Sequence, residues 1–502
     1  MKRTAKVIAI LLIISIMSIT VFSCSPAKNS NTNNANTENT SSDGSSVEAS
    51  AETATDIPFP HETRDFGGAT FTVLIDRQWD GNNLDVTDYD MESMNGDVMN
   101  DAYYTRNTTV EDTYNIKIQA VHNDDISTFA NKTIKSGIDE YDAYIPRLMN
   151  AGTFAEKGYA VNLIGTNLTL DAPWWDQNIV KDTSIGGAAY FIAGDIFIKH
   201  YDGISMLFFN KKLLSDFGLD NPYNLVNNNQ WTIDKFNELV KSDGVTMDLN
   251  SDGKMTRDDR YGFNTQADDL PSFVNGSGEK FVSKDANDMP TFTGATEKIS
   301  NIIDKMLDVY VNYTYDMHRD AYGKEKGSGQ LVQFWVFPEG RALFYWGFPR
   351  YIELGLRSME DDFGMLPIPK WDSTQDRYYS TLNNWHSYTY MVPITVADVD
   401  KSTYIMDALA YYGKQIIKPA YYDVCLQRKY TRDEESSAML DIIFSSSFYD
   451  LGTVYGLGGY VDALESDIQK NKNPMTTDYD KLQNKINTDL TKLIDQFEAN
   501  KG

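Results

Sequence analysis

The chain has 502 residues, of which 45 are Lys or Arg and 72 are Asp or Glu, so its formal net charge is −27 at pH 7. Phosphate backbones repel a chain of this charge, and no basic patch interleaved with aromatic residues accompanies it. We therefore expect no nucleic-acid partner. The length also exceeds what one hydrophobic core fills, which predicts two lobes.

The first segment has the order of an export signal. Lys2, Arg3 and Lys6 precede an apolar run over residues 7–22, which stops at Ser23 and Cys24. The run has roughly 16 residues, whereas a membrane-spanning helix needs roughly 20. We predict a signal peptide over residues 1–23.

A cysteine stands where this signal would be cleaved. Val21-Phe22-Ser23-Cys24 resembles the bacterial lipobox, in which Cys24 carries a diacyl anchor with chains such as palmitate. Phe22 departs from that pattern, which prefers smaller residues, and an ordinary secretory signal with an incidental cysteine is the alternative. Two acyl chains anchor a protein stably. The resemblance implies attachment to the extracellular face of the bacterial cell membrane through Cys24 alone.

Residues 24–57 are dominated by Asn, Thr, Ser and Ala. Such a segment has too little apolar surface to offset the entropy cost of ordering it. We predict a flexible tether that separates a folded body from the anchor.

The body begins with strands that alternate with helices. Residues 69–75, 116–121 and 141–145 have strand patterns, and residues 98–114 have a helical one. This order predicts a parallel sheet, in which ligands bind at the carboxyl ends of the strands. The loops at residues 76–80 and 146–150 lie there.

Two further segments show strand and helix signals. Residues 208–214 read as a strand that passes into a helix, and Asn221-Pro222-Tyr223 reads as a turn. Thr232 is predicted to cap a helix over residues 233–241, with Asp234 in its first turn.

Short motifs also follow one another in a specific order along the body. They are Ala172-Pro173-Trp174-Trp175-Asp176, Gly194-Asp195, Asp202-Gly203, residues 208–214, Asn221-Pro222-Tyr223, residues 231–234, residues 364–370 and residues 418–422. Together they resemble the family 1 extracellular solute-binding proteins of ABC-type sugar importers.

The resemblance implies an α/β, two-lobe, periplasmic-binding-protein-like fold. Each lobe has a mainly parallel sheet flanked by helices, and a hinge of several strands joins them. We assign residues 58–200 and 346–398 to the N-terminal lobe. Residues 201–345 and 399–502 are assigned to the C-terminal lobe.

A twelve-residue segment from Asp248 to Asp259 reproduces the EF-hand calcium loop. Gly253 supplies the sharp turn, Met255 is the apolar anchor, and Asp259 stands where sensor loops have a Glu. A metal-free turn rich in Asx residues is the alternative. The pattern predicts a structural Ca²⁺ ion held by Asp248, Asn250, Asp252, Lys254, Thr256 and Asp259.

A sugar presents apolar C–H faces and a fringe of hydroxyls, which suits aromatic rings combined with planar polar groups. The resemblance assigns ligand binding to three places. They are the loop after the first strand, the segment near residues 199–203 where the chain first crosses between the lobes, and residues 344–350, where it returns. Arg147 and Asn150 follow the third strand, and Trp385 lies in a loop without apolar periodicity. The predicted ligand-binding residues are Asp76, Arg77, Trp79, Arg147, Asn150, Asp202, Trp346, Phe348, Arg350 and Trp385.

Each of these residues has a structural alternative. Trp346 and Phe348 could pack the hinge, Asp76 and Asp202 could be surface or turn carboxylates, and Arg147 could be a plain salt-bridge donor. Trp174 and Trp175 are expected to anchor a lobe.

No catalytic motif is recognised in the sequence, so we predict no enzyme. The resemblance implies a monomeric solute-binding component that captures a carbohydrate, in particular an oligosaccharide, by hinge closure and delivers it to an ABC permease in the membrane. A non-sugar solute such as a peptide or polyol is one alternative, and a surface glycoside hydrolase is the other.

Overall fold

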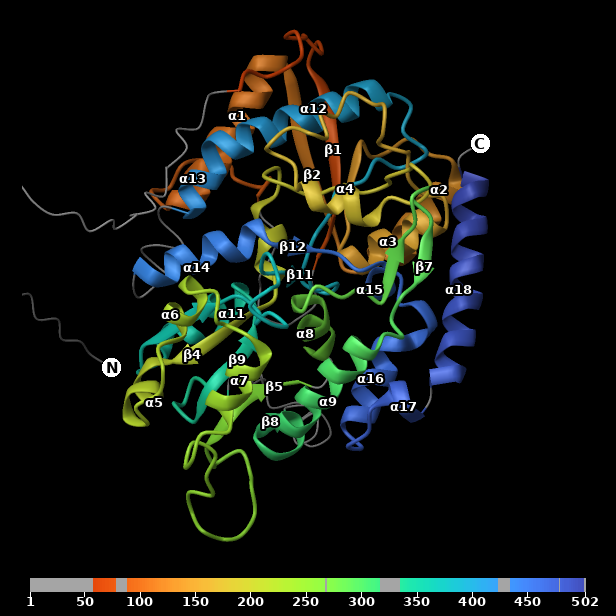
Figure 1. Ribbon diagram of the computed structural model, residues 1–502. Coiled ribbons are helices and arrows are strands. Elements are labelled where there is room, and N and C mark those ends of the chain that lie inside the picture. Colours follow the sequence, from red (N-terminus) through yellow and green to blue (C-terminus); the bar gives the residue numbers. More distant parts are fainter. Residues whose placement is uncertain are drawn as a thin grey trace, which may run out of the picture. The chain divides into compact units, whose positions relative to one another are not determined.

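The computed structural model describes residues 57–77, 88–266, 269–316, 335–422, 434–477 and 479–500 (Figure 1). The predicted signal peptide, Cys24, the tether up to residue 56 and Trp79 lie outside these residues. Residues 58–502 form one compact unit by their contacts. Within the described residues, none of the helices combines the length and the apolar character needed to cross a membrane.

The first sheet contains the three strands expected near the start of the body. They are β1 Ala69–Asp76, β2 Ile116–Asn123 and β3 Ala143–Ile145, in the order β2-β1-β3. Both pairs are parallel, with Ala69 opposite Ile116 and Val73 opposite Ala143. The predicted strands and parallel sheet are confirmed.

Helices α1 Val98–Tyr114 and α2 Ile126–Ser136 connect these strands. The Asp97 carboxylate caps α1 by accepting hydrogen bonds from the backbone N–H groups of Met99 and Asn100, both at 3.1 Å. Asn115 ends α1 with a φ of 49°, a left-handed conformation that Asn tolerates. The predicted helix over residues 98–114 is confirmed.

Strand β3 and the second half of β1 are buried on both faces, as is usual in parallel sheets, whereas β2 is only partly buried. Phe71, Val73 and Ile75 point into a core shared with helix α12 Val399–Tyr412, which also packs against α1. Figure 1 shows α12 beside β1, β2 and α1. The assignment of residues from 399 onward to the C-terminal lobe is therefore wrong for α12, because its apolar face fills the core of the first sheet.

Asp407 in α12 ties this core together. Its buried carboxylate accepts hydrogen bonds from Trp174 Nε1 and Trp175 Nε1, both at 2.8 Å, and from Thr169 Oγ1 at 2.8 Å. The two tryptophans thus anchor the lobe, as expected.

The second sheet is mixed, with the strand order β10-β4-β9-β5-β8. Strand β5 is parallel to β8 and β9, whereas β4 is antiparallel to β9 and β10. The strands are β4 Met206–Asn210, β5 Tyr261–Thr265, β8 Thr314–Asp316, β9 Ala342–Gly347 and β10 Phe363–Leu366. Because β10 pairs with β4, residues 363–366 belong to the second sheet and not to the N-terminal lobe assigned above.

Three local predictions around this sheet have different outcomes. Strand β4 passes directly into α5 Lys211–Asp216, as expected. Thr232 caps α7 Ile233–Val240 through its Oγ1, which accepts from the backbone N–H of Lys235 at 3.3 Å. The predicted turn at residues 221–223 is wrong, because Pro222 occupies the first position of helix α6 Pro222–Asn227 and Asn221 caps it.

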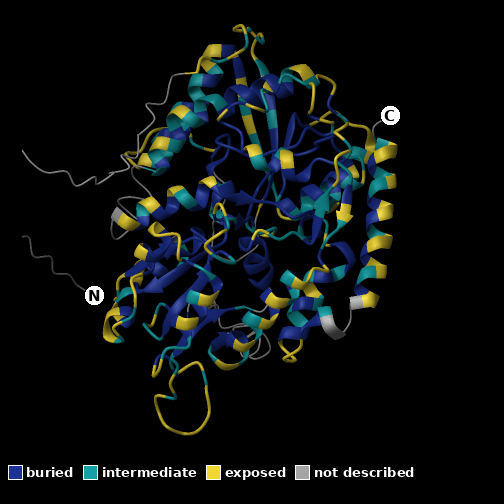
Figure 2. Ribbon diagram, in the orientation of Figure 1, coloured by how far each residue is buried: buried dark blue, intermediate teal, exposed yellow. Residues whose placement is uncertain are grey.

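The remaining elements surround the two sheets, and Figure 2 shows exposed residues along the outer side of α18. They are α3 Leu148–Glu156, α4 Gln177–Thr183, η1 Ile198–Gly203, α8 Leu270–Gly276, β6 Val282–Lys284, β7 Pro290–Phe292, α9 Glu297–Asn312, α11 Arg350–Leu354, η4 Leu356–Ser358, β11 Ser380–Thr381, η5 Gly413–Ile417, α13 Lys418–Ala420, α14 Glu434–Ser445, β12 Ser447–Phe448, α15 Leu451–Val454, η7 Leu457–Gly459, α16 Tyr460–Ile468, α17 Pro474–Thr477 and α18 Tyr479–Asn500.

Two segments that run between the sheets, residues 203–205 and residues 381–387, lie against each other. The backbone N–H of Ser205 donates to Thr381 O at 2.8 Å, and that of Asn383 donates to Gly203 O at 2.9 Å. A Cβ on Gly203 would lie 2.4 Å from Ser387 Oγ and 2.8 Å from the carbonyl carbon of His386. Only glycine fits this contact without displacing the opposite chain.

Replacing Gly203 by Ala should therefore lower the free energy of unfolding by about 1–3 kcal/mol, the usual cost of overpacking. Urea unfolding of Gly203→Ala, Ser387→Ala and the double variant measures this. Ser387→Ala removes the nearest atom and should restore part of the loss. Equal stability of Gly203→Ala and the parent protein would contradict the close-contact argument.

Candidate functional site

A cavity of about 380 Å³ lies where segments from both sheets meet. The contributors from α3, after the first sheet, are Met149, Thr153 and Glu156. The contributors around the second sheet are Asp269, Pro271, Ser272 and Trp346. The connecting segments add Ser205 and Thr381, Leu382, Asn383, Asn384 and Trp385, and the chain from α15 to α16 adds Thr453, Val454, Tyr455, Gly456, Val461 and Asp462.

Four of the predicted residues come together on the side of the first sheet. Asp76 is buried at the end of β1, and its Oδ2 accepts from Arg147 Nε at 2.9 Å and from Asn150 Nδ2 at 2.8 Å. The Arg147 guanidinium lies 5.6 Å from the ring centroid of Trp385, which lines the cavity. Asp76 therefore positions Arg147, and Arg147 supports Trp385.

Trp385 is 56% exposed, and its backbone is fixed by a neighbouring side chain. Asn383 Oδ1 accepts from the backbone N–H groups of Trp385 at 2.9 Å and His386 at 3.2 Å. This Asx turn presents the indole to the cavity. An exposed aromatic ring held in this way suits ligand stacking.

On the side of the second sheet, Trp346 lines the cavity and Phe348 supports it. Trp346 Nε1 donates to Ser272 Oγ at 2.8 Å, and the Phe348 ring packs edge-on against Trp346 at 4.6 Å between centroids. Phe348 is buried and does not line the cavity. The ligand-facing role thus fits Trp346, whereas Phe348 fits its structural alternative.

His386 connects the two sides behind Trp385. Its ring packs against Phe348 at 5.0 Å between centroids. Burial lowers the pKa of His386 to about 3, and the positive charges of Arg350 and Arg147 contribute to the shift. His386 is therefore neutral near neutral pH, and the predicted residues Arg350 and Arg147 both lie close enough to influence it.

Two predicted residues lie elsewhere. Arg77 is exposed and pairs with Asp124 at 3.6 Å, and Asp202 accepts a hydrogen bond from Tyr421 Oη at 2.8 Å. Neither lines the cavity. Of the three residues that the resemblance assigned to the loop after the first strand and to the first crossing, only Asp76 lies near the cavity, whereas Arg77 and Asp202 do not.

Sequence reasoning missed several cavity residues, above all the carboxylates of Glu156, Asp269 and Asp462 and the phenol of Tyr455. Glu156 is the last residue of α3, so the start of that helix at the carboxyl end of β3 gave no signal for it. The others lie on α8 and on the chain from α15 to α16, for which no motif was recognised.

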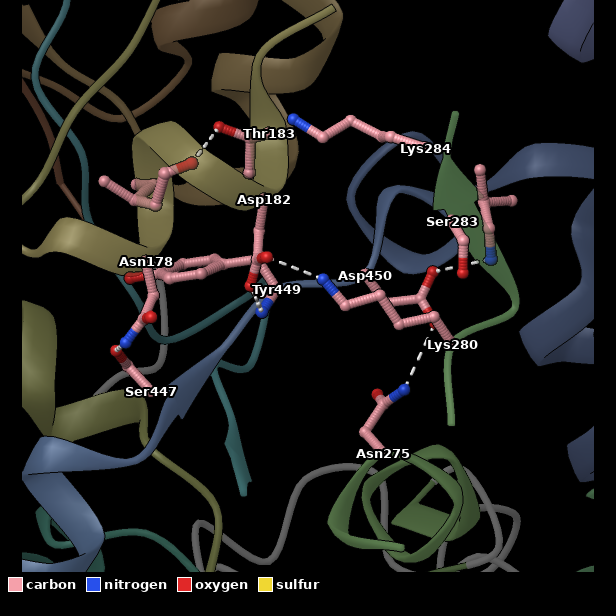
Figure 3. Close-up of polar contacts among 12 residues, drawn as sticks. Asn178, Asp182, Thr183, Asn275, Lys280, Ser283, Lys284, Ser447, Tyr449 and Asp450 are labelled. Carbon is pink, nitrogen blue, oxygen red and sulfur yellow. Dashed lines mark hydrogen bonds and ion pairs between the residues drawn. The ribbon is translucent and has the colours of Figure 1, made fainter. Parts of the chain in front are cut away.

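A separate polar network joins α4 to the hairpin of β6 and β7 (Figure 3). Lys280 Nζ pairs with Asp182 Oδ1 at 2.7 Å, and Lys284 Nζ donates to Ser184 Oγ at 2.8 Å. The Asp450 carboxylate accepts from the backbone N–H of Phe281 at 2.6 Å. These contacts connect segments that follow the first and the second sheet in the chain.

The predicted calcium loop lies away from the cavity. Asp248 Oδ2 accepts from the backbone N–H of Gly253 at 2.7 Å, and Asn250 Oδ1 accepts from that of Asp252 at 2.9 Å. Gly253 has a φ of 80°, so the expected sharp turn is present. The first half of the loop therefore has the compact shape expected from the pattern.

The second half of the loop differs. The buried Asp259 carboxylate accepts from the backbone N–H groups of Leu249 at 2.9 Å and Thr256 at 2.7 Å. Met255, the expected apolar anchor, is exposed. Nowhere in the described ranges do three or more His, Cys, Asp or Glu side chains gather as metal ligands would. The geometry fits a calcium site only in part, and calcium binding stays a prediction.

No protein-family model matches this sequence, and no curated protein matches it either. Solved structures do resemble its fold. An ABC substrate-binding protein of Listeria monocytogenes in complex with cycloalternan has a TM-score of 0.53 at 12% identity, covering 84% of this chain and 99% of its own. A maltose/maltodextrin-binding domain of Bdellovibrio bacteriovorus bound to maltotriose has a TM-score of 0.51 at 14% identity, covering 84% and 100%.

A maltose-binding periplasmic protein of Listeria monocytogenes in complex with maltose has a TM-score of 0.51 at 14% identity, covering 85% of this chain and 97% of its own. Those three proteins are described as binding proteins, not enzymes. At such identities the likeness defines the fold. This chain has the two-lobe α/β fold of the solute-binding proteins of ABC transporters, which is the fold class that its sequence predicts.

The lowered pKa of His386 leads to a pH-dependent stability. In the unfolded chain His386 takes up a proton near pH 6.5, whereas in the folded protein it does so only near pH 3. The unfolded state therefore binds more protons in this window, and the parent protein should lose about 2 kcal/mol of stability between pH 7 and pH 5 through this group.

Urea unfolding of the parent and His386→Gln at both pH values tests this expectation. The difference in unfolding free energy between the two proteins should change by that amount, because the substitution removes the titrating group. A difference that is the same at pH 7 and pH 5 would contradict it.

Proposed function

We propose that this protein is the solute-binding component of an ABC transporter and that it captures a carbohydrate, in particular an oligosaccharide, in the cavity described above. The observation that carries the proposal is the lining itself. Trp346, Trp385 and Tyr455 supply aromatic rings, and the amides of Asn383 and Asn384 lie among them. The three similar structures were solved with cycloalternan, maltotriose and maltose, which supports a sugar ligand here.

The chemistry of the lining suits a sugar for two reasons. Aromatic rings pack against the apolar C–H faces of a sugar ring, and amide and hydroxyl groups exchange hydrogen bonds with its hydroxyls. The hydroxyls of Thr153, Ser272 and Thr453 add to the amides. A cavity of about 380 Å³ also lies within the usual range for small-molecule sites.

Capture would proceed by closure of the two lobes about the connecting segments. A ligand that contacts both α3 and Trp346 binds better when the two walls are close, so it shifts the equilibrium toward the closed form. The full proposal includes the lipid anchor at Cys24, the extracellular face of the cell membrane, a monomeric state and delivery of the ligand to a permease.

Trp385 offers the sharpest test, because its side chain is exposed and its removal should leave the fold intact. Calorimetric titration with oligosaccharides found in a thermal-shift screen should show at least tenfold weaker binding by Trp385→Ala, a loss of about 1.4 kcal/mol or more. Trp371→Ala is the matched control, because Trp371 does not line the cavity. The ligand should be recovered without new reducing ends, which separates capture from hydrolysis.

Failure of every oligosaccharide in the screen would refute the proposed ligand class. Equal weakening by Trp371→Ala would show that the loss is not local to the cavity.

We also propose that the loop from Asp248 to Asp259 binds Ca²⁺ as a structural ion. The carboxylates and amide of Asp248, Asn250 and Asp252, the Lys254 carbonyl and the Thr256 side chain are the candidate ligands, and Asp259 would have to exchange its bonds to Leu249 and Thr256 for the ion. The compact first half of the loop supports the proposal.

Titration of chelator-stripped protein with millimolar Ca²⁺ in a calorimeter should therefore give a binding heat. Asp248→Asn should abolish that heat, whereas Asp258→Asn, at an exposed position that the pattern does not use, should preserve it. The absence of heat in the parent protein would remove the calcium site.

A further inference from the structure

The described side chains that line the cavity carry negative charge and no positive charge. Glu156, Asp269 and Asp462 contribute three carboxylates, and the lining includes no Lys, Arg or His among the described residues. A bound group with negative charge would meet these carboxylates at short range in a partly desolvated site, where like charges repel strongly. The lining therefore discriminates by charge as well as by shape.

Two basic side chains near the lining already form ion pairs with carboxylates. Arg147 pairs with the buried Asp76, and Lys492 Nζ pairs with Glu156 Oε1 at 3.1 Å. Asp462, in the first turn of α16, makes no direct ion pair in the part of the chain that the structure describes, although Lys485 Nζ lies near it beside Gly459. The charge of Asp462 thus remains available to a ligand.

The lining also has buried oxygen atoms without a hydrogen-bond partner among the described residues. Asn384 Oδ1 is buried and accepts no hydrogen bond from any described residue. Tyr455 Oη is also buried and has no hydrogen-bond partner among the described residues. Burial raises the pKa of this phenol, and Glu156 lies close enough for the negative charge of its carboxylate to contribute. The Asn384 oxygen can only accept and therefore needs a donor, whereas the Tyr455 hydroxyl can donate or accept, and leaving either group unsatisfied is costly. An ammonium group offers three donors, a hydroxyl offers one, and an ionised carboxyl group offers none.

The aromatic residues of the same cavity favour the same kind of group. The faces of Trp346, Trp385 and Tyr455 are electron-rich, and an ammonium group close to such a face is attracted to it. Aromatic rings and carboxylates together therefore stabilise a positive charge from two directions.

We propose that the cavity selects glycans that carry a free amino group, prefers them to neutral glycans of the same backbone, and excludes glycans that carry carboxylate groups. This inference rests on the proposed function, because it refines the ligand class of the same cavity. Asp462 is the specificity-determining residue, since its carboxylate lines the cavity and makes no direct ion pair in the described part of the chain.

A glycan array with aminated, neutral and uronate members across several linkages tests the order of preference. Calorimetry then compares one matched set of β-1,4-linked trimers or of the linkage that the array selects. The aminated trimer should bind about tenfold tighter than the neutral one at low ionic strength, and salt should reduce this ratio. The uronate trimer should show no binding.

Two variants locate the effect. Asp462→Asn should lower the ratio several-fold through a loss of affinity for the aminated trimer. Asp495→Asn removes the same charge at an exposed position of α18 outside the cavity and should leave the ratio unaltered. Equal losses in both variants would show an effect of net charge alone and would overturn the role of Asp462.

The remaining outcomes separate this inference from the proposed function. Neutral or uronate trimers that bind as tightly as the aminated one would overturn the amine preference and leave carbohydrate capture standing. An array without any bound glycan would overturn both.

Discussion

The contact between Gly203 and the segment from His386 to Ser387 is the constraint on which the site depends. The two connecting segments approach so closely that a Cβ on Gly203 would clash with the opposite backbone. Backbone hydrogen bonds from Ser205 to Thr381 and from Asn383 to Gly203 then fix the register of the two segments. Ser205 and residues 381–385 form one wall of the cavity. The position of this wall relative to both sheets is therefore set by backbone packing before any ligand-binding side chain contributes.

On the side of that wall next to the first sheet, the buried carboxylate of Asp76 positions two polar side chains. Asp76 holds Arg147 and Asn150, and the Arg147 guanidinium lies against Trp385. A buried charge persists only when it is paired and hydrogen-bonded, so this arrangement is strongly determined. The same pairing leaves Arg147 less able to attract an anion, which is why a basic residue beside the cavity does not give it positive character.

Local sequence signals predicted what depends on neighbours in the chain. Period-two alternation located β1 and β2, Thr232 marked the start of α7, and the position of Asp76, Arg147 and Asn150 after parallel strands brought them to one edge. The sheet to which a segment belongs could not be predicted in this way. The apolar patterns of β10 and α12 show that each is buried, but not against which sheet. Asp462 escaped notice for a related reason, because nothing near it in sequence indicates a cavity.

The cavity lining and the residues behind Trp385 differ in charge, and the position of His386 explains how that difference is maintained. Arg147 and Arg350 lie near a histidine that burial keeps neutral, so no further positive charge is added behind Trp385. Glu156, Asp269 and Asp462 line the cavity itself. The positively charged side chains of Arg147 and Arg350 thus stay behind Trp385, whereas the carboxylates line the cavity. A ligand that enters between them gains most when its own donors and any positive charge point toward α16.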